Sequence, residues 1–457
     1  MPPQDDVSVF DVARAIDEGG WNSFQKRVLV LAALAFAVDG LATLVIGLAI
    51  PALIVAWHAP KSAFAPIAAA GLIGVAIGST LGGMLGDRVG RRIGLIGSVF
   101  LFGVATLATA AASGASQLLI LRFIAGLGIG GAIPNGAALI AEFTPLRRRS
   151  LAIALGMLFI PVGGLLSGLL GTVILPTLGW RGLFLVSGLL PVALGVTFLL
   201  VLPESPRFLA RAPLRHDELR RLLIRFGLNP ASNATVIDSA GGRQHTHLAA
   251  LFGSSTRRDT LALWVGFFFC LLANYSMLSW FPTLLLTQGF PLAITSLGLT
   301  VFNLGGVAGG VLGGWLIGRF GSRLSVPALA AGSAVGALAL GVLPFDPARG
   351  VIEPVLMLII EGVFIAGLHT GLYTLAAHVY PPFAKATGVG AASTIGRIGA
   401  VFSSYTGVLS MELGGQRSYF IVIAGAVTIS LLGIAFMRTH IPAGARAAGN
   451  LALNPAE

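Results

Sequence analysis

Four charged residues interrupt long apolar stretches of this sequence: Asp39, Arg122, Glu361 and Arg397. Placing a charged side chain at the centre of a bilayer costs about 3 kcal/mol or more, so charges at that depth mark ion or substrate pathways. A carboxyl group can bind and release a proton, and a guanidinium can hold a carboxylate with two parallel hydrogen bonds. These residues therefore point to proton exchange and acid binding within a membrane.

The position of Asp39 favours a role in proton binding. It lies eleven residues beyond the start of an expected helix over residues 28–57, about 16 Å along the axis and near mid-membrane. We expect Asp39 to carry the coupling proton; the alternative is a carboxylate held in a permanent ion pair. Arg122 lies about 8 Å inside the outer face of an expected helix over residues 117–142, a depth from which an arginine can also snorkel outward.

Arg397 is the residue that we expect to bind the acid group of a substrate. It lies eleven residues beyond the start of an expected helix over residues 386–410, too deep to reach either interface easily. Its planar guanidinium suits a carboxylate. The alternative is that Arg397 serves as the partner of Glu361, which we otherwise expect to be a second titrating group.

Further polar side chains in the apolar runs can complete a cavity. His369 and Tyr373 share one face of an expected helix, with Glu361 two turns earlier. Amides can bond polar substituents of a ligand, and aromatic side chains can flank its ring. The predicted substrate-binding set is Arg397, Asn274, Tyr275, Asn303, His369 and Tyr373. The alternative for His369 and Tyr373 is ordinary packing between helices.

The elements that position these residues are apolar helices. The chain has 457 residues, 55% of them hydrophobic and 10% charged, and its mean hydropathy of +0.89 exceeds that of soluble domains. About 20 helical residues cross a bilayer, and twelve runs are long enough. They cover 28–57, 64–86, 93–112, 117–142, 150–174, 181–202, 260–286, 293–318, 325–344, 354–378, 386–410 and 418–437. We therefore predict an all-α polytopic membrane protein.

Small residues indicate how these helices pack. Gly74, Gly78, Gly82 and Gly86 recur at four-residue spacing. Such a stripe lies on one helix face and lets a neighbouring backbone approach closely. We expect a tight contact between helices along this stripe.

The net charge of +11 raises the possibility of a nucleic-acid partner, which the distribution of the charge excludes. With the N-terminus in the cytoplasm, 23 of the 29 Lys and Arg residues fall in cytoplasmic segments, four fall outside and two fall within spans. This asymmetry predicts a multi-pass membrane protein with both termini cytoplasmic, and we expect its location to be the bacterial inner membrane. The acidic first 27 residues do not resemble a cleavable signal, and the single Cys270 predicts neither a disulfide nor a metal site.

An internal repeat divides the chain into two halves. GGMLGDRVGRRI at 82–93 matches GGWLIGRFGSRL at 313–324, as in transporters built from parallel repeats with a central site. We predict two pseudo-symmetric six-helix bundles. The expected boundaries are a cytoplasmic segment at 1–27, bundles at 28–202 and 260–437, a cytoplasmic linker at 203–259 and a cytoplasmic tail at 438–457.

The repeated loop predicts a cytoplasmic gate. Its glycines permit a sharp turn, and its Asp and Arg side chains can form ion pairs across the closed interface between halves. The predicted gate residues are Gly83, Asp87, Arg88, Gly90, Arg91, Arg92, Arg319 and Arg323. The alternative is that the arginines only fix topology. Gly318 replaces Asp87 in the second copy, so we expect a weaker gate there.

These motifs resemble those of a known transporter group. GGMLGDRVGRR is similar to the signature loop of the major facilitator superfamily, and PESPRF at 203–208 resembles a motif of its sugar and organic-acid members. Stretches before the first span and in spans four, seven and eleven resemble the aromatic acid:proton symporter family. The resemblance implies the major facilitator fold, and a proton-coupling role in which Arg122 pairs with Asp39. One departure is Ala42, where that family usually has a second Asp.

These observations lead to a hypothesis of proton-coupled uptake of a small organic anion, such as a benzoate or hydroxybenzoate, by alternating access. One proton with one monoanion is electroneutral. We expect a monomer in the lipid bilayer, with protons as the coupling ion and without cofactor, metal or catalytic residue. The alternatives are a proton-coupled exporter of drugs or amphipathic compounds and a ligand sensor. An intramembrane enzyme is disfavoured because no span carries a metalloprotease or nucleophile motif.

Overall fold

Long helices dominate the computed structural model of the chain, which describes residues 9–228, 235–238, 251–253, 256–380 and 384–443. The N-terminal half contains α2 (Ser23–Trp57), α3 (Ala65–Val89), α4 (Arg91–Thr109), α5 (Ala115–Phe143), α6 (Leu146–Met157) and α7 (Phe159–Val201). The C-terminal half contains α10 (Arg257–Thr287), α11 (Leu292–Phe320), α12 (Ser322–Val342), α13 (Ile352–Val379) and α14 (Lys385–Ala435). Short 3-10 turns cover Lys61–Phe64 and Pro347–Arg349.

Two of these helices account for four of the predicted crossings. Gly179 interrupts α7 with φ 65°, and Gly414 and Gly415 interrupt α14, where Gly415 has φ 60°. Glycine adopts this left-handed conformation without the steric cost of a Cβ atom. The ten candidate spans in the described residues therefore accommodate twelve crossings in two six-helix bundles, which confirms the predicted fold class.

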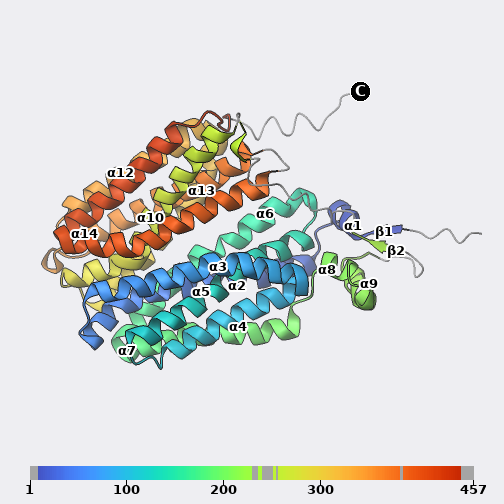
Figure 1. The fold of residues 1–457 in the computed structure, drawn as a ribbon, viewed down its shortest axis with the longest axis horizontal. Coiled ribbons are helices and arrows are strands. Elements are labelled where there is room, and N and C mark those ends of the chain that lie inside the picture. The colour runs from blue at the N-terminus through green and yellow to red at the C-terminus, as the bar shows by residue number, and fades with distance from the viewer. Residues whose placement is uncertain (1–8, 229–234, 239–250, 254–255, 381–383, 444–457) are drawn as a thin grey trace, which may run out of the picture.

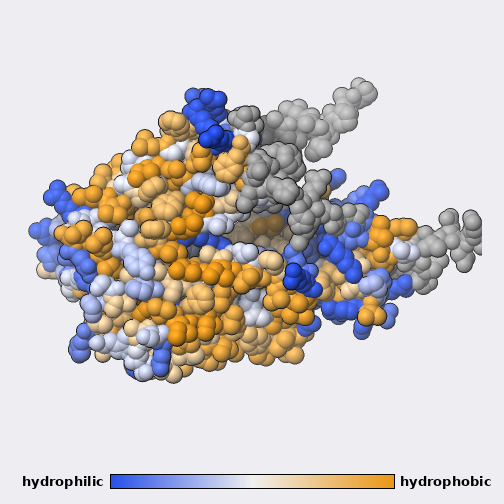
Figure 2. Space-filling view, in the orientation of Figure 1, coloured by the Kyte–Doolittle hydropathy of each residue, from blue (hydrophilic) through white to orange (hydrophobic). Residues whose placement is uncertain are grey.

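The surface has the character of a protein solvated by lipid. In Figure 2 the sides of the helices are mainly hydrophobic, and hydrophilic residues gather towards the helix ends. Large apolar side chains such as Leu200, Val342 and Leu413 are more than three-quarters exposed. A soluble protein rarely presents so much contiguous apolar surface. Bilayer contact explains this pattern.

A small folded region lies at one end of the bundle, which we call the linker end. It contains α1 (Val12–Glu18), α8 (Pro206–Ala210), a 3-10 turn (Pro213–Arg215), α9 (His216–Arg225) and two strands, β1 (Val9–Asp11) and β2 (Thr235–Ile237). The strands pair in parallel, with Val9 opposite Thr235. No pattern in the sequence predicts this two-stranded sheet, which joins the N-terminal segment to the predicted linker.

The two halves pack against each other at the opposite, distal end, where α2 ends and α3 begins. Contacts between halves join α7 to α11, α2 to α10 and α3 to α14; Figure 1 shows the N-terminal half, blue to green, below the C-terminal half. Two glycines mark the closest approaches. A Cβ atom on Gly47 would lie 2.4 Å from the Leu278 carbonyl oxygen, and one on Gly168 would lie 2.1 Å from the Thr300 hydroxyl. The halves are thus tightly joined in their distal portion.

The predicted glycine stripe of α3 packs directly on α5. A Cβ atom on Gly78 would lie 2.1 Å from the Leu127 carbonyl oxygen, and one on Gly74 would lie 2.3 Å from that of Phe123. Both distances are far below van der Waals contact with backbone atoms that cannot rotate away. The predicted close contact between helices is confirmed.

This packing gives a stability prediction. We expect Gly78→Ala to lower the free energy of unfolding by about 1–3 kcal/mol, because the methyl group forces α3 and α5 apart. Thermal unfolding of the purified protein in detergent measures the change. Gly97→Ala on α4 is the matched control, since nothing lies within 4 Å of a Cβ atom there. Equal stability of the two variants would show that the stripe is not closely packed.

Candidate functional site

A polar group lies at the centre of the interface between halves. Asp39 on α2 is 2% exposed and interacts electrostatically with Arg397 on α14. Arg397 also donates a hydrogen bond to the hydroxyl of Ser79 on α3. Tyr275 on α10 lies close enough to interact with both Asp39 and Arg397. Because α2 and α3 belong to one half and α10 and α14 to the other, the electrostatic interaction between Asp39 and Arg397 crosses the interface, without a hydrogen bond or a close ion pair between the two side chains.

The partner of Arg397 is Asp39 rather than Glu361. The Glu361 carboxyl is fully buried and accepts a hydrogen bond of 2.6 Å from Ser333 on α12. Its second oxygen has no partner among the described residues. The alternative pairing of Arg397 with Glu361 is therefore wrong for this conformation, and the role of Glu361 as a second titrating group stays a prediction.

Arg122 does not pair with Asp39 in this conformation, contrary to the expectation from the resemblance. Its guanidinium donates hydrogen bonds to the hydroxyls of Thr106 at 3.2 Å and Thr109 at 3.0 Å. It also lies over the ring of Phe184, 5.1 Å from the centroid. At 3% exposure it does not snorkel outward either. Sequence spacing gave its depth but not the neighbours that it faces.

Aromatic side chains form one wall beside the Asp39–Arg397 interaction. His369 and Tyr373 share a face of α13, with ring centroids 5.1 Å apart. The Tyr373 hydroxyl lies 2.9 Å from that of Ser393, and its ring meets Phe267 edge to face. Tyr373 also lies near Tyr275. This wall connects α10, α13 and α14 within the C-terminal half.

The two predicted asparagines differ in their surroundings. Asn303 on α11 is 7% exposed and donates to the Leu299 carbonyl at 2.9 Å. Its side-chain oxygen faces Gly164 of α7, where a Cβ atom would approach to 2.6 Å. Asn303 therefore packs at the contact between halves. Asn274 is half-buried on α10, next to Tyr275.

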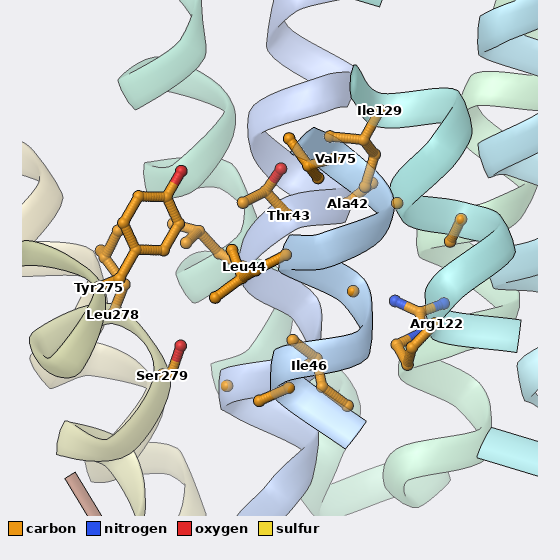
Figure 3. Close-up of a pocket in the computed structure, with 16 residues that line it drawn as sticks. Ala42, Thr43, Leu44, Ile46, Val75, Arg122, Ile129, Tyr275, Leu278 and Ser279 are labelled. Carbon is orange, nitrogen blue, oxygen red and sulfur yellow. The ribbon is translucent and has the colours of Figure 1, made fainter. Parts of the chain in front are cut away.

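A small cavity lies on the distal side of Asp39. Residues of α2, α3, α5 and α10 enclose about 40 Å³. Figure 3 shows Arg122 at one end of this pocket and Tyr275 and Ser279 at the other, with Ala42 and Thr43 between them. An engineered cavity that admits benzene encloses about 150 Å³. The cavity therefore has room for a small polar group and not for a ring in this conformation.

The predicted gate loop forms its ion pairs within the N-terminal half. Arg91 pairs with Asp87 and lies 3.5 Å from Glu142 of α5. The gate prediction requires pairs across the interface between halves, and these pairs do not cross it. On the other half, Arg319 and Arg323 are exposed, as is Arg88. Ion pairs between the two halves at the linker end stay a prediction for a conformation in which that end is closed.

Two glutamates that contact the predicted gate loop, Glu142 and Glu204, were not among the predicted functional residues. Glu204 accepts a hydrogen bond of 3.0 Å from the Arg92 backbone, and Ser205 donates to Glu142. Burial raises the pKa of the Glu204 carboxyl above its ordinary value, while the N–H groups of Arg92 and Ser205 oppose that rise. Gly90 has φ 110°, and a Cβ atom there would lie 2.2 Å from Glu204. The PESPRF motif was the available signal, since it contains Glu204.

Comparison with known proteins identifies related transporters. A family model described as Major Facilitator Superfamily matches residues 32–404. The 4-hydroxybenzoate transporter PcaK of Pseudomonas aeruginosa is 31% identical, over 96% of this chain and 98% of that protein. The gallate transporter of Pseudomonas putida is 34% identical, over 90% and 91%. The benzoate transport protein of Acinetobacter baylyi is 27% identical, over 92% of each.

Solved structures show the same fold. The xylose transporter XylE of E. coli, in a partially occluded inward-open conformation, superimposes with a TM-score of 0.72, over 92% of this chain and 99% of that one. Its sequence identity of 20% supports the fold alone.

Proposed function

The chain belongs to the major facilitator superfamily, and from this membership we propose that it is a proton-coupled uptake transporter for aromatic carboxylates. Its relatives and structural neighbours are transporters, and the chain is a multi-pass membrane transporter rather than an enzyme. The relatives named for 4-hydroxybenzoate, gallate and benzoate support the substrate class. The proposed location is the bacterial inner membrane, with both termini cytoplasmic and the distal end outside.

The observation that carries the proposal is the interaction of Asp39 with Arg397 across the two halves. A substrate carboxylate competes with Asp39 for the guanidinium, which forms strong paired hydrogen bonds with carboxylates. A displaced Asp39 would be a buried charge without a partner, a state costing about 3–5 kcal/mol. Protonation removes that cost. Substrate binding and proton binding therefore favour each other.

This competition sets the stoichiometry. One proton enters on Asp39 with one monoanion on Arg397, so the loaded centre carries the same net charge as the empty one. Reorientation of the two halves then moves no net charge across the membrane. The driving force is the pH gradient, which supplies about 1.4 kcal/mol per unit.

The aromatic wall suits the rest of the proposed substrate. Tyr275 lies near both Arg397 and Tyr373, and His369 packs against Tyr373, so the three side chains present ring faces and edges. Aromatic pairs gain about 0.5–1.5 kcal/mol beyond their buried area. The hydroxyl of Tyr373 and the unpartnered Nε2 of His369 can bond ring hydroxyl groups. We propose that this wall selects aromatic over aliphatic acids.

Counterflow tests the substrate class. Proteoliposomes loaded with unlabelled acid are diluted into trace labelled 4-hydroxybenzoate at equal pH on both sides. We expect internal benzoate, 4-hydroxybenzoate or gallate to drive transient accumulation, whereas internal benzyl alcohol, which lacks the carboxylate, does not. If none of the acids drives accumulation in protein that exchanges another solute, aromatic acids are excluded as substrates. The assignment of the fold would not be affected.

A further inference from the structure

Arg122 carries a buried positive charge that no carboxylate of the described residues neutralises. Its partners are the neutral hydroxyls of Thr106 and Thr109 and the ring of Phe184. Its Nε atom is buried and has no hydrogen-bond partner within the described ranges. Burying an uncompensated charge is costly. The site therefore favours an anion that comes from solution.

The other central arginine, Arg397, has a different electrostatic environment. Arg397 already has the carboxylate of Asp39 as an electrostatic partner. No carboxylate among the described residues interacts with Arg122 in this way. An anion at Arg122 would supply the partner that it lacks.

The cavity described above provides free space beside Arg122. Arg122 lines it together with Ala42, which stands about one helical turn beyond Asp39 towards the distal end. Tyr275 and Ser279 line its other end (Figure 3), and they belong to α10 of the opposite half. Separation of the halves at the distal end would therefore widen the cavity. Its present volume of about 40 Å³ is large enough for a small polar group.

We propose that this cavity is a distal subsite for the substrate carboxylate, with Arg122 as its counter-charge. The proposal rests on the proposed function and adds a second binding position to it. A carboxylate arriving from the distal end meets Arg122 before it reaches Arg397.

The subsite is tested by introducing an anionic side chain of the protein into the cavity. Ala42→Asp places a carboxylate in the cavity with Arg122, and Ala42→Asn introduces nearly the same volume without charge. Equilibrium binding of labelled 4-hydroxybenzoate is measured on both variants and the unaltered protein in lipid nanodiscs. The buffer is a sulfate salt free of chloride and of other carboxylates. A second pair, Arg122→Gln and Arg122→Lys, removes or keeps the positive charge.

We expect Ala42→Asp to bind at least tenfold more weakly than Ala42→Asn, a difference of about 1.4 kcal/mol. We also expect Arg122→Gln to bind more weakly than Arg122→Lys. Equal affinity within each pair, while the unaltered protein binds, would overturn the subsite and leave the proposed function intact. Absence of binding to the unaltered protein would overturn both. Competition by added chloride as strong as that by benzoate would assign the site to inorganic anions instead.

Discussion

Asp39→Asn will abolish uptake driven by a pH gradient and leave counterflow at equal pH in place. Asparagine has nearly the shape of aspartate but cannot take up the proton that accompanies the substrate. The substrate can still bind Arg397 and be exchanged, because exchange needs no net proton movement. The pH gradient, about 1.4 kcal/mol per pH unit, can then no longer drive uptake, because no side chain binds the proton that accompanies the substrate.

The measurement is the initial rate of labelled 4-hydroxybenzoate uptake into proteoliposomes with an acidic exterior. Protein-free liposomes supply the baseline, since weak aromatic acids cross bilayers in their protonated form. Asp39→Glu is the matched control, because it keeps a titrating carboxyl group. Gradient-stimulated uptake by Asp39→Asn at the rate of the unaltered protein would move the proton site away from Asp39.

Arg397→Gln will weaken substrate binding about a hundredfold, which corresponds to about 2.7 kcal/mol. The loss follows from removing charge-assisted hydrogen bonds worth about 1.5–3 kcal/mol each. Arg397→Lys keeps the charge but not the planar fork, and we expect an intermediate affinity. Equilibrium binding of labelled 4-hydroxybenzoate measures the three proteins.

The same substitution has a second effect that separates binding from folding. Arg397→Gln leaves Asp39 buried beside no cation, so we expect lower thermal stability. The double variant with Asp39→Asn removes both charges and should regain stability without regaining affinity. Binding by Arg397→Gln within threefold of the unaltered protein would show that another residue holds the carboxylate.

The sequence predicts the helices of this fold well and their contacts poorly. Apolar length locates every crossing, because a bilayer imposes one minimum helix length on all of them. Depth along a helix also identified Asp39 and Arg397 as central residues. Which helices face each other depends on rotation and packing, so the expected pairing of Arg122 with Asp39 was wrong in this conformation.

The features that could not be predicted are contacts between residues that lie far apart in the sequence. The hydrogen bond from the Arg92 backbone to Glu204 joins residues 112 positions apart, and the pairing of β1 with β2 joins the N-terminal segment to the predicted linker. Neither leaves a periodic pattern in the sequence. The cavity beside Arg122 is likewise invisible in sequence, since four helices from both halves enclose it.

Coupling of one proton to one carboxylate is best tested by measuring how membrane potential affects protein-dependent 4-hydroxybenzoate uptake. Valinomycin and defined potassium concentrations set the potential in proteoliposomes, while buffers set the pH gradient independently. We predict that an inward pH gradient drives uptake equally well at zero and at inside-negative potential. Uptake driven by an inside-negative potential alone, without a pH gradient, would contradict the coupling of one proton to one carboxylate.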